Sequence, residues 1–164
     1  MKVALGCDHN AFELKEYIKK YLERQHHEVV DYGCYSRDAV DYPDVAFQVA
    51  IDLREGQFSR AILVCGTGIG MAIAAGKVPG IRAALCHDTY SAERARKSNN
   101  AQVLTMGAKV IGPEAALKVV EAWMNAEFEG GNSGRKVNKI MEKEQEFIRS
   151  GDHEKADQQS DCSC

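Results

Sequence analysis

The sequence has neither a long apolar run nor a large excess of one charge. Its 164 residues hold only short apolar stretches, such as Ala61–Cys65 and Ala72–Ala75, far below the roughly 20 residues that cross a bilayer. Residues 1–6 run directly into polar residues, so the apolar core of a secretory signal is not visible. We therefore expect a cytoplasmic protein that does not associate with membranes.

The small charge imbalance lies at one end of the chain. The formal net charge is −3, from 24 acidic and 21 basic residues, and four acids but one base fall within residues 151–164. The rest of the chain is therefore neutral. Binding to a nucleic-acid backbone needs a strong positive field, so nucleic acid is not an expected partner. A bound phosphate should be a small one, held in a local basic pocket.

Length and composition indicate one folded domain followed by a tail. With 45% apolar and 27% charged residues, the chain can bury a core of ordinary size. We expect a single domain over residues 1–148. Residues 149–164 contain no Val, Ile, Leu, Met or aromatic side chain, which predicts a disordered polar tail.

The six cysteines do not indicate a disulfide scaffold, because a chain with this much core needs no covalent cross-links. Four of them lie at or near the end of an apolar run, where reduced and partly buried thiols are expected. The other two form a Cys-x-Cys pair in the tail, which cannot close a zinc site without further ligands. The two sets are Cys7, Cys34, Cys65 and Cys86, and Cys162 with Cys164.

Short apolar runs alternate with amphipathic stretches of helical length. The runs predict five strands, at 2–6, 28–31, 61–65, 81–86 and 103–106, with a helix after each. Asn10 is predicted to cap the first helix, the helix from Pro113 should end near Phe128, and the last helix should span about 135–148. This alternation is typical of a parallel sheet covered on both faces. The predicted fold is a Rossmann-like three-layer α/β/α sandwich with a five-stranded parallel sheet.

In such sheets, ligands bind beyond the carboxyl ends of the strands, at the point where the strand order reverses. The residues that directly follow the strands are therefore the candidates for chemistry. They form four groups: Cys7-Asp8-His9, Cys65-Gly66-Thr67-Gly68, His87-Asp88 and Gly107-Ala108-Lys109.

Gly66, Gly68 and Gly70 form a glycine-rich turn after a buried strand. The turn is not a dinucleotide fingerprint, because its sixth position is Met71. The spacing to Gly76-Lys77 does not match a Walker A loop either. What remains is a backbone nest at a helix N-terminus, which suits an anion or a developing oxyanion. A tight turn without a ligand is the alternative.

Cys65 directly precedes this nest. A helix dipole and nearby amide hydrogens stabilise a thiolate, so Cys65 could act as a nucleophile or a general base; a small core residue at a strand end is the alternative. Asp8 and His9 follow the first strand, which should lie beside the third. A carboxylate, an imidazole and a thiol in one crevice make an acid–base constellation without an obvious metal site. Helix capping by Asp8 and a surface location for His9 are the alternatives.

Five motifs occur in one order along the chain. They are Gly6-Cys7-Asp8-His9, Asp41-Tyr42-Pro43, Cys65-Gly66-Thr67-Gly68-Ile69-Gly70, Lys77-Val78-Pro79-Gly80-Ile81-Arg82-Ala83 and Ser98-Asn99-Asn100-Ala101. Together they resemble the type B ribose-5-phosphate isomerases and their relatives that act on galactose and allose 6-phosphates. The resemblance covers about residues 1–148.

The resemblance implies an enzyme of the pentose phosphate pathway that interconverts D-ribose 5-phosphate and D-ribulose 5-phosphate through a cis-enediolate. Cys65 would be the general base that moves a proton between C2 and C1, without a metal or cofactor. The family's site lies between two subunits, so a homodimer, or a tetramer of two dimers, is implied. Substrate-binding roles are implied for Asp8, His9, Gly66, Thr67, Gly68, Ile69, Gly70, Asn99, Lys109, Asn132 and Lys136.

The chain departs from the family's pattern at several positions. Members without the cysteine base carry a glutamate after the glycine loop, where this chain has Met71. An imidazole that opens the furanose ring is usual at the position of Ser98. We therefore expect ring opening to fall to Asp8, with Thr67 and Ser98 as hydroxyl relays, or to occur without catalysis in solution. Asn132 stands where arginine is usual, which removes a charge from the phosphate site.

Two other functions fit the sequence less well. A 6-phosphohexose isomerase, acting on allose 6-phosphate or galactose 6-phosphate, would use the same residues. A flavodoxin-like module that binds phosphate or nucleotide without catalysis would share the fold, although the usual nucleotide loops are missing.

Overall fold

The computed structural model describes residues 1–160, with side chains described up to residue 150. The chain divides into two compact units, Met1–Phe128 and Glu129–Cys164. None of the described helices is long and apolar enough to cross a membrane.

The first unit is built on the predicted five-stranded parallel sheet. The strands lie in the order β2-β1-β3-β5-β4, and each neighbouring pair is parallel. The chain therefore moves outward in opposite directions from β1 and β3, and their carboxyl ends flank the switch point. The strands are β1 (Lys2–Cys7), β2 (Glu28–Asp31), β3 (Arg60–Cys65), β4 (Ala83–Leu85) and β5 (Val103–Gly107).

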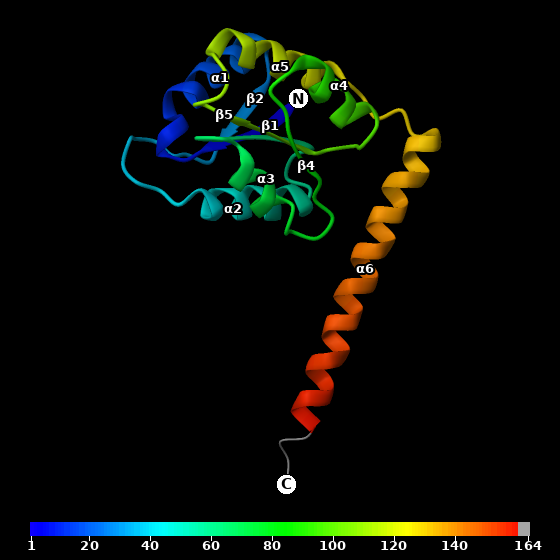
Figure 1. The fold of residues 1–164 in the computed structure, drawn as a ribbon. Helices are drawn as coiled ribbons and strands as arrows, with labels where there is room; N and C mark the ends of the chain where they lie inside the picture. The colour runs from blue at the N-terminus through cyan, green and yellow to red at the C-terminus, as the bar shows by residue number, and fades with distance from the viewer. Residues whose placement is uncertain (161–164) are drawn as a thin grey trace. The chain divides into compact units, whose positions relative to one another are not determined.

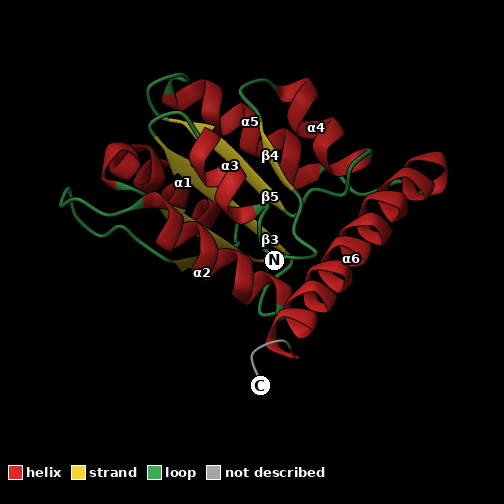
Figure 2. Cartoon of the chain, turned by 60° about the horizontal axis from the view of Figure 1, so that its bottom comes forward, coloured by secondary structure: helices red, strands yellow, loops and turns green. Residues whose placement is uncertain are grey.

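Helices cover both faces of this sheet, which confirms the α/β/α sandwich (Figure 1). Figure 2 shows the strands as one twisted layer between them. One face carries α1, α4 and α5, and the other carries α2 and α3. The helices of this unit are η1 (His9–Ala11, a 3-10 turn), α1 (Phe12–Arg24), α2 (Tyr42–Arg54), α3 (Ile69–Ala75), α4 (Thr89–Lys97) and α5 (Pro113–Asn125).

The central strand β3 is buried on both faces because its apolar side chains alternate between two cores. Ile62 and Val64 belong to the core beneath α1, α4 and α5. Leu63 and Cys65 belong to the core beneath α2 and α3. An uninterrupted apolar run is what a strand in this position requires, and it leaves the Cys65 thiol on the face that α3 covers.

Three predicted boundaries are wrong in detail. Asn10 does not cap the first helix: it lies within the 3-10 turn η1, whose cap is Asp8, and Asp8 Oδ1 accepts the Asn10 N–H at 3.0 Å. The N-cap residue of α1 is Ala11, which makes no side-chain capping bond. β4 is limited to three residues. α5 ends at Asn125 rather than near Phe128, because Ala126 takes an extended backbone conformation.

The second unit is a single helix, α6 (Gly131–Ser160). It begins earlier than predicted, because Gly130 and Gly131 with positive φ make the turn and Gly134 N–H already bonds to the Gly130 carbonyl. It also continues past residue 148, where the sequence predicted its end. Residues 161–164, with Cys162 and Cys164, lie outside the described residues, and the domain boundary and disordered tail stay predictions.

Candidate active site

The carboxyl ends of three neighbouring strands bring the predicted polar groups to one edge of the sheet. Cys7 is in register with Val64, so Asp8 follows beside Cys65, and the Asp8 N–H donates to the Val64 carbonyl at 3.2 Å. On the other side of β3, Cys65 is in register with Gly107. The groups that follow β1, β3 and β5 therefore meet as the sequence predicted.

The glycine loop aims a backbone donor at the Cys65 sulfur. The N–H of Gly68 lies 3.1 Å from Cys65 Sγ. Gly68 has a φ of 78°, and a Cβ there would lie 2.6 Å from the Met106 carbonyl carbon. Only glycine allows both the left-handed conformation and this close approach to β5. The loop thus holds an N–H where it stabilises negative charge on sulfur.

The other cysteines of the first unit lie in different electrostatic surroundings. Burial raises the pKa of the Cys7 thiol far above its ordinary value, and the neighbouring Cys34 sulfur, 3.6 Å away, adds to this effect. Burial also raises the pKa of Cys86 to about 11. The Cys7 and Cys86 thiols therefore stay protonated near neutral pH.

Lys109 brings a positive charge to the glycine loop. Its N–H donates to the Gly66 carbonyl at 3.0 Å, and its side chain runs along Gly66. Within the described part of the chain, no carboxylate forms an ion pair with Lys109. A lysine ammonium next to a nest of amide hydrogens is suited to a small anion such as phosphate.

Asp8 and His9 are both held by Asn10. Asp8 is only 5% exposed and accepts from the Asn10 backbone N–H and from its Nδ2 at 3.2 Å. The other contact of Nδ2 is His9 Nε2, also at 3.2 Å. Sequence reasoning assigned Asn10 only to capping and missed this bridge. Its exposed amide covers a buried carboxyl group that forms no ion pair among the described residues.

Two further residues lie at this edge: Tyr42, which the sequence did not place there, and His87, which it placed there without a role. The Tyr42 ring lies against the loop, since a Cβ on Gly70 would come within 2.5 Å of it. His87, which follows β4, accepts the Gly107 N–H on Nε2 at 2.8 Å. The backbone of Gly107 in turn abuts that of Thr67. The position of His87 after a strand was a usable signal, whereas nothing in the sequence placed Tyr42 against Gly70.

Ser98 and Asn99 are not brought to Cys65 within one chain. They follow α4, and the adjoining Gln102 carbonyl accepts from Ala61 N–H at the start of β3. Cys65 ends the same strand four residues after Ala61, about 13 Å away. The Ser98 hydroxyl oxygen accepts from Arg94 Nε at 3.0 Å and from Arg94 Nη2.

Asn132 and Lys136 belong to the second unit. Both are exposed and lie one turn apart in the first part of α6, which places them on the same side of that helix.

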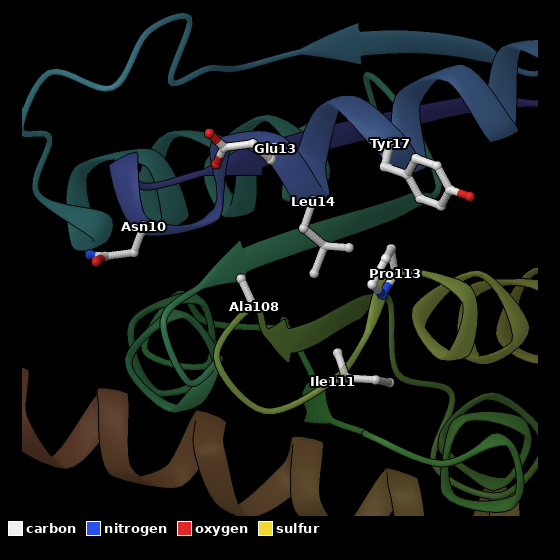
Figure 3. A pocket seen from close by; sticks show the side chains of 7 residues that line it. All are labelled: Asn10, Glu13, Leu14, Tyr17, Ala108, Ile111 and Pro113. Atoms are coloured by element: carbon white, nitrogen blue, oxygen red, sulfur yellow. The ribbon is translucent and has the colours of Figure 1, made fainter.

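A pocket of about 340 Å³ borders the site at Asn10 (Figure 3). It lies between α1 and the loop after β5, on the face of the sheet opposite to the Cys65 thiol. Asn10, Glu13 and Tyr17 supply its polar groups. The floor is apolar and is made by Leu14, Ala108, Ile111 and Pro113. The described residues contain no group of three or more His, Cys, Asp or Glu side chains that could hold a metal ion.

The fold and this edge define a class of protein: an α/β enzyme that presents a thiol at an anion-stabilising glycine loop. The model of the ribose/galactose isomerase family matches residues 3–140. The chain belongs to this family and is an isomerase.

Individual relatives agree. A D-erythrulose-4-phosphate isomerase of Pectobacterium atrosepticum is 54% identical over 142 residues, covering 85% of this chain and 93% of that protein. A ribose-5-P isomerase B of Listeria innocua is 48% identical over 145 residues, covering 88% and 98%. The ribose-5-phosphate isomerase B structure from Clostridium thermocellum superposes with a TM-score of 0.88 at 43% identity, covering 90% of this chain and 99% of that one.

Proposed function

We propose that the chain interconverts D-ribose 5-phosphate and D-ribulose 5-phosphate in the cytoplasm, with Cys65 as the general base. The Cys65 thiolate would take the proton from C2 of the open-chain aldose, which leaves a cis-enediolate. It would return the proton to C1 while the hydroxyl proton on O2 passes to O1, which gives the ketose. The amides of residues 66–70 would stabilise the enediolate oxygens. The observation that carries the proposal is the 3.1 Å hydrogen bond from Gly68 N–H to Cys65 Sγ, since it favours the anionic sulfur that a base needs.

The remaining groups at this edge suit a phosphorylated sugar. Asp8 and His9 offer a carboxyl group and an imidazole to its hydroxyls, and Asp8 would supply the proton for ring opening. Lys109 would bind the phosphate, and the resemblance implies the same role for Asn132 and Lys136. Lysine acts there as a point charge without the two-pronged geometry of arginine. Six-carbon 6-phosphates are the alternative substrates within the same chemistry.

A homodimer with shared sites accounts for Ser98 and Asn99. Both lie at the edge of the sheet opposite to Cys65, so they would contact a substrate held by the Cys65 of a second copy. The second unit supports association as well. Ile140 and Phe147 of α6 are 54% and 70% exposed, and burial of such side chains is a common driving force for assembly.

A complementation experiment tests the shared site. Cys65→Ala and Asn99→Ala chains are prepared separately, each with low activity, and then mixed and allowed to exchange subunits. In a shared site, half of the dimers are mixed and one of their two sites carries no substitution, so about a quarter of the wild-type rate returns. A mixture with only the mean rate of the two variants would mean that each site lies within one copy.

A second candidate substrate is D-erythrulose 4-phosphate, and two observations favour it. The relative at 54% identity carries that name. In addition, Ser98 occupies the position where the resemblance implies a ring-opening imidazole, and its oxygen is engaged by Arg94. A four-carbon aldose with phosphate on its terminal oxygen has no free hydroxyl that closes a furanose. Such a substrate needs no ring opening.

The two candidates separate in a rate comparison with one designed variant. Initial rates are measured on ribose 5-phosphate, erythrose 4-phosphate, allose 6-phosphate and galactose 6-phosphate. If the four-carbon sugar is the substrate, it is turned over fastest, and Ser98→His raises only the rate on cyclic ribose 5-phosphate. If ribose 5-phosphate already leads in the wild type, the four-carbon assignment is wrong. No turnover of any sugar phosphate would overturn the proposed function itself.

A further inference from the structure

In the turn Asp8-His9-Asn10, the hydrogen-bond donors outnumber the acceptors available to them when Asp8 is ionised and His9 is neutral. Asn10 Nδ2 lies 3.2 Å from both Asp8 Oδ2 and His9 Nε2. On the far side of the imidazole, the Val40 N–H points at His9 Nδ1 at 3.3 Å. Both ring nitrogens of His9 therefore face N–H groups, but a neutral imidazole has only one nitrogen that accepts.

The conflict depends on the charge of Asp8. When Asp8 is ionised, its carboxylate requires the NH₂ group of Asn10, so His9 Nε2 faces a donor as well. Either neutral tautomer of His9 then places one ring N–H against another donor. The Nδ1–H tautomer keeps the shorter contact, from Asn10 Nδ2 to Nε2 at 3.2 Å, and loses the one from the Val40 N–H at 3.3 Å. One donor of the turn is then left facing another donor.

Protonation of Asp8 removes the conflict. A 180° rotation of the Asn10 amide places its Oδ1 between Asp8 and His9, in reach of both. That oxygen can accept from a protonated Asp8 Oδ2 and from His9 Nε2–H at the same time. Nδ1 is then free to accept from Val40, so every group in the turn has a partner.

We propose that Asn10 is a positioning residue that couples the protonation of Asp8 to the tautomer of His9. When Asp8 is protonated, His9 carries its proton on Nε2. When Asp8 gives its proton to a substrate oxygen, the Asn10 amide rotates and the His9 proton is found on Nδ1. The role in turnover rests on the proposed function, whereas the coupling is a property of the free protein. Other titratable groups near the turn are Cys65 on β3, Lys109 after β5 and Glu13, which pairs with Arg37. Among the described residues, none of these is hydrogen-bonded to the carboxyl group or the ring.

Ring-nitrogen NMR tests the coupling directly. The full-length protein is labelled with ¹⁵N-histidine, and the His9 signals are assigned by comparison with His9→Gln. In the wild type, we expect the two nitrogen shifts to exchange their Nδ1 and Nε2 character across the pH range in which Asp8 titrates. In Asn10→Ala, this step should vanish. Asp8→Asn, which always offers a donor to the amide oxygen, should hold the Nε2–H tautomer at every pH.

Kinetics of the same variants test the role in turnover. Asn10→Ala should lower kcat about tenfold, as expected for loss of one hydrogen bond at a reacting group, with KM within about twofold. Tyr17→Phe, which changes another lining residue of the same pocket, is the matched control and should keep the wild-type rate. The Asp8 cap on the Asn10 backbone N–H survives the alanine substitution, so the fold is preserved.

Two results would overturn the proposal. One is a His9 nitrogen profile in Asn10→Ala that equals that of the wild type. The other is a pH-dependent tautomer change that persists in Asp8→Asn. Both are read without substrate, so they stand apart from a failure of the proposed function, which would appear as a wild-type enzyme without isomerase activity.

Discussion

The amino and carboxyl ends of the strands differ in whether their charged side chains are paired. At the amino end of β3, the buried Arg60 guanidinium donates to the carbonyls of Trp123, Met124 and Ala126 and pairs with Glu127. At the carboxyl end, Asp8 and Lys109 form no ion pair among the described residues. At the amino end, the Arg60 guanidinium supplies donors to the carbonyls at the end of α5, since the final carbonyls of a helix otherwise lack donors. At the carboxyl end, the charges of Asp8 and Lys109 are therefore available to a ligand.

Substitution of Cys65 should have the largest effect and should act on rate alone. Cys65→Ala is expected to lower kcat by about 10²–10⁴-fold, the usual contribution of a positioned base, without a change in melting temperature beyond that of Cys86→Ala. The control removes a buried thiol from the same edge whose raised pKa keeps it neutral. Isomerase assays with thermal melts decide the matter, and near-full activity in Cys65→Ala would refute the assignment.

Substitution of Arg60 should have the opposite signature. Arg60→Met leaves the carbonyls of Trp123, Met124 and Ala126 without their donor, which should cost about 1–3 kcal/mol of unfolding free energy for each carbonyl that stays buried and unpaired. The kcat per folded molecule should stay unchanged, because the Arg60 guanidinium is buried and its hydrogen bonds go to the end of α5 and Glu127 rather than to a substrate. Urea titration and activity measurements below the unfolding transition test both parts. A fall in kcat of the fully folded variant would contradict the assignment of Arg60 to stability alone.

Asp31 tests whether every charged group at the carboxyl edge is functional, because it ends β2 yet is fully paired. Burial alone would raise the pKa of Asp31, but hydrogen bonds from Lys19 and Lys15 hold it below its usual 3.8. Lys15 is completely buried and also donates to the Cys34 carbonyl. Asp31→Asn should therefore cost about 2 kcal/mol at pH 7, because the buried Lys15 ammonium loses one of its two carboxylate partners and keeps only Glu16.

The pH dependence of that loss follows from the direction of the shift. A carboxyl group with a depressed pKa contributes stability above its unfolded pKa and loses it as the pH falls through its folded pKa. The stability difference between the wild type and Asp31→Asn should thus be full at neutral pH and shrink progressively below about pH 4. Urea titrations between pH 3 and 7 measure it, and a constant difference would contradict the ion-pair account.

The smallest effect is expected at Ser98. Ser98→Ala should reduce the rate on ribose 5-phosphate roughly tenfold or less, because a neutral relay hydrogen bond contributes about 1 kcal/mol. The rate on ribulose 5-phosphate, which does not close to a furanose, should change even less. Initial rates in both directions give the comparison. A loss as large as that in Cys65→Ala would show that the hydroxyl, and not Asp8, carries the ring-opening step.

The comparison of the edges also explains which predictions from sequence succeeded. Strand and helix periodicity are local properties, so the five strands and the clustering of residues 7–9, 65–68 and 107–109 followed from pattern and the switch-point rule. The role of Asn10 did not follow. A polar residue three positions before Glu13 looks like a helix cap, and only the folded chain shows that Asp8 takes the cap and frees the Asn10 amide.

By itself, the sequence determined the layered α/β/α architecture, the thiol at the head of a glycine loop and the resemblance to an isomerase family. These features depend on the spacing of residues over short stretches of the sequence, which does not depend on the tertiary structure. Tertiary structure alone decided that Tyr42 lies on Gly70, that His87 braces Gly107, and that Ser98 sits at the edge away from Cys65. Those relations depend on strand order and on close approach between segments far apart in the chain. No local pattern encodes them, because each is set by packing across the whole sheet.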